Sequence, residues 1–214
     1  MILSPRFYQT LHFDCDAERA RLGLRPDLPT ALVSFGGQGS MDAVKVARVL
    51  NRLRRPVQMI VLCGRHQEAF RQLQSMRHRA PVSVQGFTTD VPFYMSLADF
   101  FIGKPGPGSI SEALAMRLPV IVERNQWTLA HERYNADWIV EQGVGAVVSH
   151  LSQLGATLDE LLSPDRYQRY RANAAALKNS AVYEVPDFLE AILAGRPPEG
   201  MPLTFAATAQ VPAP

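Results

Sequence analysis

Six short apolar runs constrain the fold of this chain most strongly, because helix-length segments separate many of them. The runs are rich in β-branched and aromatic residues, and they cover residues 31–35, 59–63, 82–84, 100–102, 120–122 and 146–148. Such alternation is typical of a parallel sheet with helices on both faces. The sequence therefore predicts an α/β fold, with a Rossmann-like open sheet of about six strands.

Composition favours one globular domain in a reducing compartment. Of the 214 residues 47% are hydrophobic, and 22 Lys and Arg residues nearly balance 20 Asp and Glu residues. The net charge of +2 is too small to attract nucleic acid or an anionic membrane to the chain as a whole. Local charged patches are still compatible with it. Two cysteines, Cys15 and Cys63, are too few for a disulfide framework. We find no signal peptide or membrane-spanning stretch, so the predicted location is cytoplasmic.

Three segments are expected along the chain. Residues 1–29 are predicted to form a linker and a leading helix, and residues 30–195 the Rossmann-like domain. Residues 196–214 contain five prolines and almost no charge. This composition is typical of a disordered tail or linker.

Ligands of open parallel sheets bind beyond the carboxyl ends of the strands, so the loops after the apolar runs are informative. The first such loop reads Gly36-Gly37-Gln38-Gly39-Ser40. Its glycines could approach a phosphate, or they could only form a tight turn with positive φ. The dinucleotide fingerprint is not met, because Asp42 stands where a small residue is required. NAD is therefore not predicted.

A second glycine-rich loop follows the run at 100–102 and continues from Gly103 to Ala113. Its two Pro-Gly pairs, the expected helix start at Ser109 and the cation of Lys104 would suit a diphosphate. It is not a P-loop, because Pro105 follows Lys104. Glu112 has two interpretations: it is the partner of Ser109 in a capping box, or its carboxylate accepts hydrogen bonds from a ribose.

Polar residues also begin the helix after the run at 120–122. His131 and Glu132 lie there, where sugar-binding side chains would be expected. A surface or capping role is the alternative for both residues.

Together these loops resemble the C-terminal, nucleotide-sugar-binding half of the GT-B glycosyltransferases of family 28 type, and most closely the monogalactosyldiacylglycerol synthases. The resemblance extends over residues 31–148, and its most specific part is the run Lys104-x-Gly-Pro-Gly-Ser-Ile-x-Glu112-Ala. The fold that it implies is the α/β, Rossmann-like fold of that half, and the implied donor is a UDP-sugar.

The resemblance also implies roles for individual residues. Glu112 would hold the ribose hydroxyls, and amides of Gly108, Ser109 and Ile110 would bind the diphosphate. The remaining implied donor-binding residues are Gly36, Gly37, Gln38, Gly39, Lys104, Gly106 and Asn135, then Gly64, Arg65, Gly86 and Phe87 around the uracil, and His131 and Glu132 facing the sugar. The family usually has Gln at the position of His131, and its first glycine turn is longer, so the donor sugar stays open.

Neither a cofactor nor a tightly bound metal ion is expected. A helix N-terminus with bare glycine amides, together with the charge of Lys104, could stabilise a leaving diphosphate without metal. Asp14-Cys15-Asp16 spells the acid-x-acid motif of metal-dependent glycosyltransferases. It precedes the first run, however, and Asp14 is expected to cap the following helix.

Complete GT-B enzymes have two such domains, and the acceptor and general base belong to the first. The resemblance therefore implies the donor-binding half of an inverting hexosyltransferase that acts on a lipid and is inactive without its other half. The expected partners are the UDP-sugar and an acceptor-binding domain or subunit, with peripheral contact at the inner membrane through that partner and no nucleic acid. A separate donor-binding subunit, a non-catalytic module, a UDP-sugar epimerase-type domain and an interaction protein are the alternatives.

Overall fold

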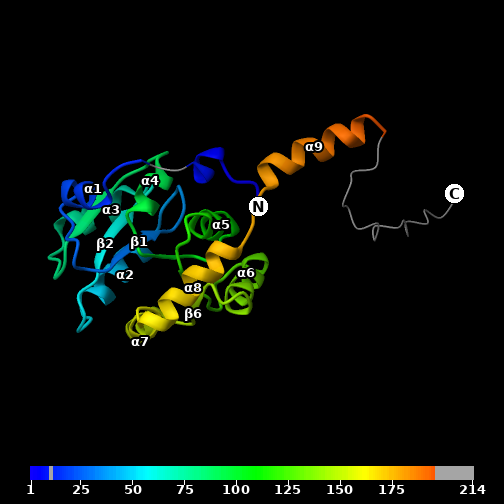
Figure 1. The fold of residues 1–214 in the computed structure, drawn as a ribbon. Helices are drawn as coiled ribbons and strands as arrows, with labels where there is room; N and C mark the ends of the chain where they lie inside the picture. The colour runs from blue at the N-terminus through cyan, green and yellow to red at the C-terminus, as the bar shows by residue number, and fades with distance from the viewer. Residues whose placement is uncertain (10–11, 196–214) are drawn as a thin grey trace. The chain divides into compact units, whose positions relative to one another are not determined.

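The computed structural model describes residues 1–9 and 12–195, and it contains the expected parallel sheet. Its strands are β1 (Thr30–Ser34), β2 (Gln58–Leu62), β3 (Val82–Gln85), β4 (Phe100–Gly103), β5 (Val120–Glu123) and β6 (Gly145–Val148). Their order is β3-β2-β1-β4-β5-β6, and each neighbouring pair is parallel. The predicted α/β, Rossmann-like fold is confirmed (Figure 1).

Helices connect the strands in chain order. Before β6 these are the 3-10 helix η1 (Pro5–Tyr8), α1 (Cys15–Arg21), α2 (Asp42–Leu50), α3 (Gln67–Ser75), α4 (Val91–Ser96), α5 (Pro107–Ala115) and α6 (Ala130–Glu141). After β6 follow η2 (Leu151–Gln153), α7 (Leu154–Leu161), α8 (Pro164–Ala176) and α9 (Ala181–Leu193).

Both faces of the sheet are covered, because alternate strand residues point in opposite directions. Val33 belongs to a core cluster with buried residues of α2, α3 and α7. Its neighbour Leu32 belongs to a second cluster with buried residues of η1, α4, α5 and α6. This two-sided burial explains why the strands read as continuous apolar runs.

The strand order reverses between β1 and β4. From β1 the chain proceeds outward through β2 and β3, and from β4 it proceeds the other way through β5 and β6. In sheets of this kind the ligand crevice lies at the carboxyl ends of the two strands that flank the reversal. The two glycine-rich loops follow these strands.

The segment before β1 contains the expected leading helix. The Asp14 carboxylate accepts hydrogen bonds from the backbone N–H groups of Asp16 and Ala17, so Asp14 caps α1. At the other end, α9 belongs to a second compact unit that begins at Ser180. The tail predicted at 196–214 lies outside the described residues, and the domain boundaries remain predictions.

Candidate functional site

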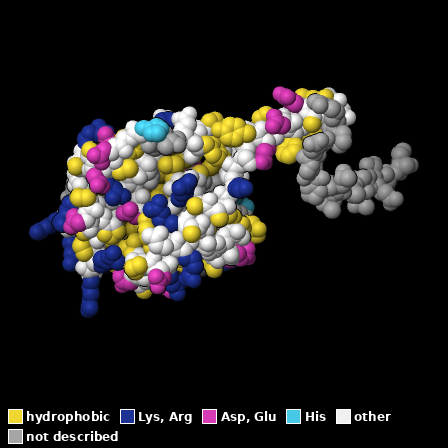
Figure 2. Space-filling view, viewed as in Figure 1, with side chains coloured by type: hydrophobic (Ala, Val, Ile, Leu, Met, Phe, Trp, Pro, Cys, Tyr) yellow, Lys and Arg dark blue, Asp and Glu magenta, His cyan; other side chains and the backbone are white. Residues whose placement is uncertain are grey.

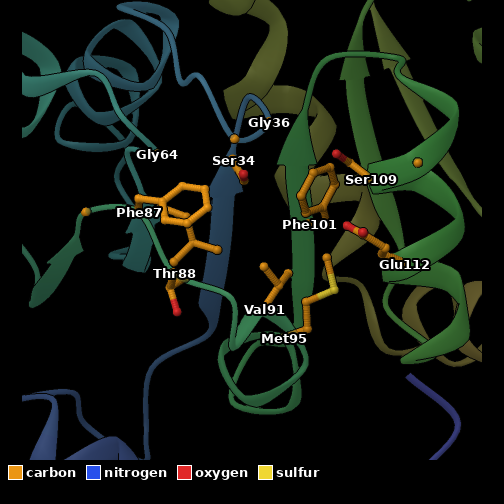
Figure 3. A pocket seen from close by; sticks show the side chains of 14 residues that line it. Ser34, Gly36, Gly64, Phe87, Thr88, Val91, Met95, Phe101, Ser109 and Glu112 are labelled. Carbon is orange, nitrogen blue, oxygen red and sulfur yellow. The ribbon is translucent and has the colours of Figure 1, made fainter. Parts of the chain in front are cut away.

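The turns after β1, β2 and β3 and the start of α5 enclose a pocket of about 230 Å³. Figure 3 shows Phe87 and Glu112 on opposite sides of it, with Ser34 and Phe101 between them. Eight of the predicted donor-binding residues line this pocket: Gly36, Gly37, Gly64, Gly86, Phe87, Gly108, Ser109 and Glu112. The pocket therefore lies where the strand order reverses.

Six further residues line the pocket, although the sequence does not single them out: Ser34, Leu62, Thr88, Val91, Met95 and Phe101. Three of them belong to strands, where sequence patterns indicate only burial. Thr88 directly follows Gly86-Phe87, and Val91 and Met95 belong to helix α4 after that turn.

The turns after β1 and β2 contact each other backbone to backbone. A Cβ atom on Gly39 would lie 1.9 Å from the carbonyl oxygen of Cys63, and one on Gly64 would lie 2.4 Å from that of Gly37. The Arg65 N–H donates to the same Gly37 oxygen at 3.0 Å. Gly39 and Gly64 also have positive φ angles of 74° and 57°. Close packing alone therefore accounts for these two glycines.

The capping box expected at Ser109 and Glu112 is wrong. Helix α5 begins at Pro107 with Gly106 as its N-cap, so Ser109 lies inside the first turn. Proline is favoured at the first helical position because it lacks the N–H that would be left unpaired there. Glu112 is consequently in the second turn, too far from Gly106 to close a capping box.

This earlier helix start changes which amides are free. The Ile110 N–H already donates to the Gly106 carbonyl at 3.2 Å, and Ile110 itself is buried in the core. Among the described residues, no acceptor is found for the N–H groups of Gly108 and Ser109. Both residues line the pocket. The helix start thus directs two unpaired amides and the positive end of its dipole there, which is the usual setting for an anion.

The Glu112 carboxylate is half-buried in the pocket wall. No hydrogen-bond donor to it is found among the residues that the structure describes. Burial raises the pKa of Glu112 above its ordinary range, because a low-dielectric environment disfavours the charged form. A carboxylate in this condition is ready to accept hydrogen bonds from the hydroxyls of a ligand.

An aromatic platform lies across the pocket from Glu112. The Phe87 ring is 54% exposed, and the Arg65 guanidinium lies 4.8 Å from its centroid. A flat ring open on one side can stack on a heterocyclic base. Arg65 thus supports Phe87 and does not itself line the pocket.

A second pocket of about 430 Å³ adjoins the turn after β1 and the β4–α5 loop. Four predicted residues line it: Gln38, Gly39, Lys104 and Glu132. The Lys104 Nζ atom lies 2.9 Å from the Glu132 Oε1 atom. Glu132 is only 6% exposed, whereas the Lys104 side chain is 46% exposed. The ion pair therefore holds a cation at the mouth of this pocket.

Helix α6 also tethers the loop that carries this cation. One turn beyond Glu132, the Asn135 side-chain amide donates to the Pro105 carbonyl at 2.9 Å. Gly106 packs against the Lys104 side chain, where an added Cβ would lie 3.2 Å from Cε. His131 is exposed and lines neither pocket. Glu132 therefore lines a pocket and His131 does not, although the sequence predicts both residues to face the sugar.

Within residues 1–9 and 12–195, no three His, Cys, Asp or Glu side chains come together in a way that could hold a metal ion. No helix in this part of the chain combines the length and apolar character needed to cross a membrane.

Comparison with known proteins gives a consistent result. A family model described as "Glycosyltransferase family 28 C-terminal domain" matches residues 30–190. The probable chloroplastic monogalactosyldiacylglycerol synthase 2 of Oryza sativa subsp. japonica is 33% identical over 193 residues, which cover 86% of this chain and 40% of that protein. The chloroplastic monogalactosyldiacylglycerol synthase of Spinacia oleracea is 29% identical, covering 82% of this chain and 35% of that protein. This chain spans less than half the length of these relatives.

Solved structures share the fold. WaaG, a glycosyltransferase involved in lipopolysaccharide biosynthesis, superimposes with a TM-score of 0.65 at 18% identity, over 91% of this chain and 55% of that one. MurG of Acinetobacter baumannii gives a TM-score of 0.65 at 17% identity, over 80% of this chain and 52% of that one.

Proposed function

Because this chain belongs to the family of glycosyltransferase family 28 C-terminal domains, we propose that it is the donor-binding half of an inverting, UDP-sugar-dependent glycosyltransferase. The proposed acceptor is a lipid, since the curated relatives are named as monogalactosyldiacylglycerol synthases. The observation that carries the proposal is the half-buried, unpaired Glu112 carboxylate opposite the Phe87 ring, beside two free amides of α5.

Each part of the pocket suits one part of UDP. The uracil stacks near Phe87, and the ribose hydroxyls donate to Glu112. The diphosphate accepts hydrogen bonds from the Gly108 and Ser109 amides at the start of α5. A pocket that combines these three features selects a nucleoside diphosphate over a free sugar or a free phosphate.

The same groups would assist transfer. When the bond between sugar and diphosphate breaks, negative charge accumulates on the diphosphate. The two amides, the helix dipole and the Lys104 ammonium group stabilise that charge. Glu132 and Asn135 act as positioning residues, because they hold Lys104 and Pro105 from the neighbouring helix α6. No cofactor is needed for this chemistry.

A complete reaction needs a second half. The general base and the acceptor surface are assigned to an acceptor-binding domain or subunit, which accords with the length of the curated relatives. The chain alone is proposed to bind the donor without transferring it. We also propose that the complete enzyme is a peripheral protein on the cytoplasmic side of a membrane.

Calorimetry with UDP, UDP-galactose and UDP-N-acetylglucosamine tests the proposal. We expect UDP to bind, one sugar nucleotide to bind more tightly than UDP, and ADP to bind more weakly because the pocket is built around the smaller uracil. Absence of heat with all three uridine nucleotides would overturn the proposal and favour an interaction protein.

A further inference from the structure

Basic residues are concentrated in one stretch of this chain. Residues 43–89 contain nine Lys and Arg residues and a single acid, Glu68, so the remainder of the chain has more acids than bases. The overall net charge of +2 conceals this asymmetry. A local excess of one charge produces a field of its own even on a nearly neutral protein.

Two loops of this stretch are joined by hydrogen bonds. The Asn51 side chain donates to the Arg77 carbonyl at 3.2 Å and accepts from the Arg79 N–H at 3.0 Å. The Arg79 guanidinium donates to the carbonyl groups of Leu53 and Arg54. The α2–β2 and α3–β3 loops therefore lie side by side, and their arginines lie close to those at the end of α2. We call this set the basic face: Arg48, Arg52, Arg54, Arg55, Arg77 and Arg79.

All six arginines of the basic face are exposed. Among the described residues, none of the six forms an ion pair with a carboxylate. Figure 2 shows Lys and Arg side chains, in dark blue, projecting from the edge of the domain where Figure 1 draws α2 and β2. Unpaired like charges repel one another, so an anionic partner would relieve this repulsion.

The surface beside the basic face is hollowed. Arg48 and Arg52 line a hollow of about 420 Å³ between α2 and α3, together with the polar side chains of Gln72 and Ser75. The same two arginines line a wider groove of about 980 Å³ that extends to Trp127. Trp127 is 82% exposed. A large aromatic ring this exposed beside cations is typical of proteins that contact the interfacial region of a bilayer.

We propose that the basic face binds the phosphate headgroups of an anionic membrane surface, with one headgroup in the hollow between α2 and α3 and Trp127 at the interface. Each cation held near such a surface contributes favourably, and the contributions accumulate over a cluster. The chain would then contact the membrane directly, and not only through a partner.

The proposed function favours a lipid surface over nucleic acid, and to that extent this inference rests on it. An acceptor lipid must reach the donor from a membrane. The groove at Arg48, Arg52 and Trp127 shares residues Asp42, Glu123, Asn125 and Trp127 with the pocket that contains Lys104. The groove thus extends from the loop before β2, which carries Arg52, to the loop after β5, which carries Trp127.

The test compares two triple variants in a vesicle flotation assay. One variant carries Arg52→Gln, Arg54→Gln and Arg55→Gln in the basic face. The matched control carries Arg21→Gln, Arg25→Gln and Arg166→Gln, which remove the same charge from three ion-paired arginines. The vesicles contain phosphatidylcholine alone or equal parts of phosphatidylcholine and phosphatidylglycerol.

We expect wild type and control to bind the anionic vesicles and not the neutral ones. The basic-face variant should bind the anionic vesicles about 100-fold more weakly, because each of the three lost arginines weakens binding by about fivefold. Equal binding by the two variants would overturn the proposal. So would tighter binding to an RNA oligonucleotide than to the vesicles. Calorimetry with UDP on the same samples reports separately on the proposed function.

Discussion

At the scale of single residues, the chemistry of Glu112 depends on where its helix begins. If the helix began after Ser109, the Glu112 carboxylate would accept a hydrogen bond from the backbone N–H of Ser109. Because Pro107 occupies the first helical position instead, Glu112 lies in the second turn, where it lines the pocket and has no donor among the described residues. Removing its charge should therefore affect ligand binding far more than folding.

Glu112→Gln tests this expectation. The substitution keeps the size of the side chain and removes the charge that accepts two ribose hydrogen bonds, so the free energy of UDP binding should weaken by about 1.5–3 kcal/mol. The melting temperature should change little. Calorimetry and thermal unfolding of the same preparation measure both, and equal UDP affinity in variant and wild type would exclude a ribose contact.

The pH dependence of uridine binding gives a second readout of the same residue. Uridine has no phosphate to titrate, and its hydroxyls bind the ionised carboxylate better than the protonated one. Because burial raises the pKa of Glu112, affinity should fall as the pH decreases through that raised value, at a pH where an exposed Glu is still ionised. In Glu112→Gln this dependence should be absent.

The Lys104–Glu132 pair can be tested by a double substitution. Lys104→Met leaves the buried Glu132 carboxylate without its cation, so the free energy of unfolding should fall by about 1–2 kcal/mol. Adding Glu132→Gln should recover part of this loss, because a neutral amide is less costly to bury. Urea unfolding of the two variants makes the comparison, and an unchanged stability of Lys104→Met would show that the pair is too solvated to matter.

At the scale of elements, the glycine turn after β1 contains one glycine that is needed for close packing and one that is not. Gly36 and Gly39 both have positive φ angles, 84° and 74°, but only at Gly39 would a Cβ meet a backbone carbonyl. Gly36→Ala should therefore cost about 1 kcal/mol of stability for its φ alone. Gly39→Ala should cost at least about 2 kcal/mol, because the turns after β1 and β2 must also move apart. Chemical unfolding measures both, and equal losses would contradict the close contact.

At the start of α5, unlike at Gly39, an added Cβ atom meets no close neighbour. A Cβ on Gly108 would have no neighbour within 4 Å, so the space beside it is open. Gly108→Val should fold, since the Cβ atom of the new side chain enters open space. It should nevertheless abolish UDP binding and leave uridine binding nearly unchanged, because only UDP places a diphosphate there. If both ligands weaken equally, the loop has no phosphate-binding role.

Much of the element order could be predicted from the sequence, because buried parallel strands read as apolar runs. Each of the six runs corresponds to a strand within a residue or two at either end. Phe35 and Cys63 fall outside β1 and β2, since the chain leaves the sheet there to form the glycine turns. The resemblance to the family 28 C-terminal half is confirmed by the family match.

The site was predictable only in part. Local patterns identify the glycine loops, but they place the start of α5 at Ser109 because the Pro-Gly pairs conceal the true N-cap at Gly106. The partner of Glu132 is Lys104, 28 positions earlier in the sequence, and no local pattern reveals a contact at that separation. His131 is exposed because its neighbour Glu132 takes the inward position on α6.

At the scale of the whole molecule, the chain contains the proposed donor site but spans only 40% of the length of the rice synthase. Transfer requires a base and an acceptor surface that are held in the correct geometry relative to the donor. Closure of two halves also excludes water from the reacting groups. We therefore propose that this chain binds the donor and that transfer needs the complete enzyme.

Reconstitution tests this division most directly. The 214-residue chain is supplied with UDP-sugar and diacylglycerol in vesicles, first alone and then with an acceptor-binding half from a curated relative, added in trans or fused. We expect donor binding without transfer by the chain alone, and galactolipid formation when the second half is present. Transfer by the chain alone at rates typical of whole enzymes would contradict it, and would show that a residue of this chain, with His131 the first to be tested, acts as the base.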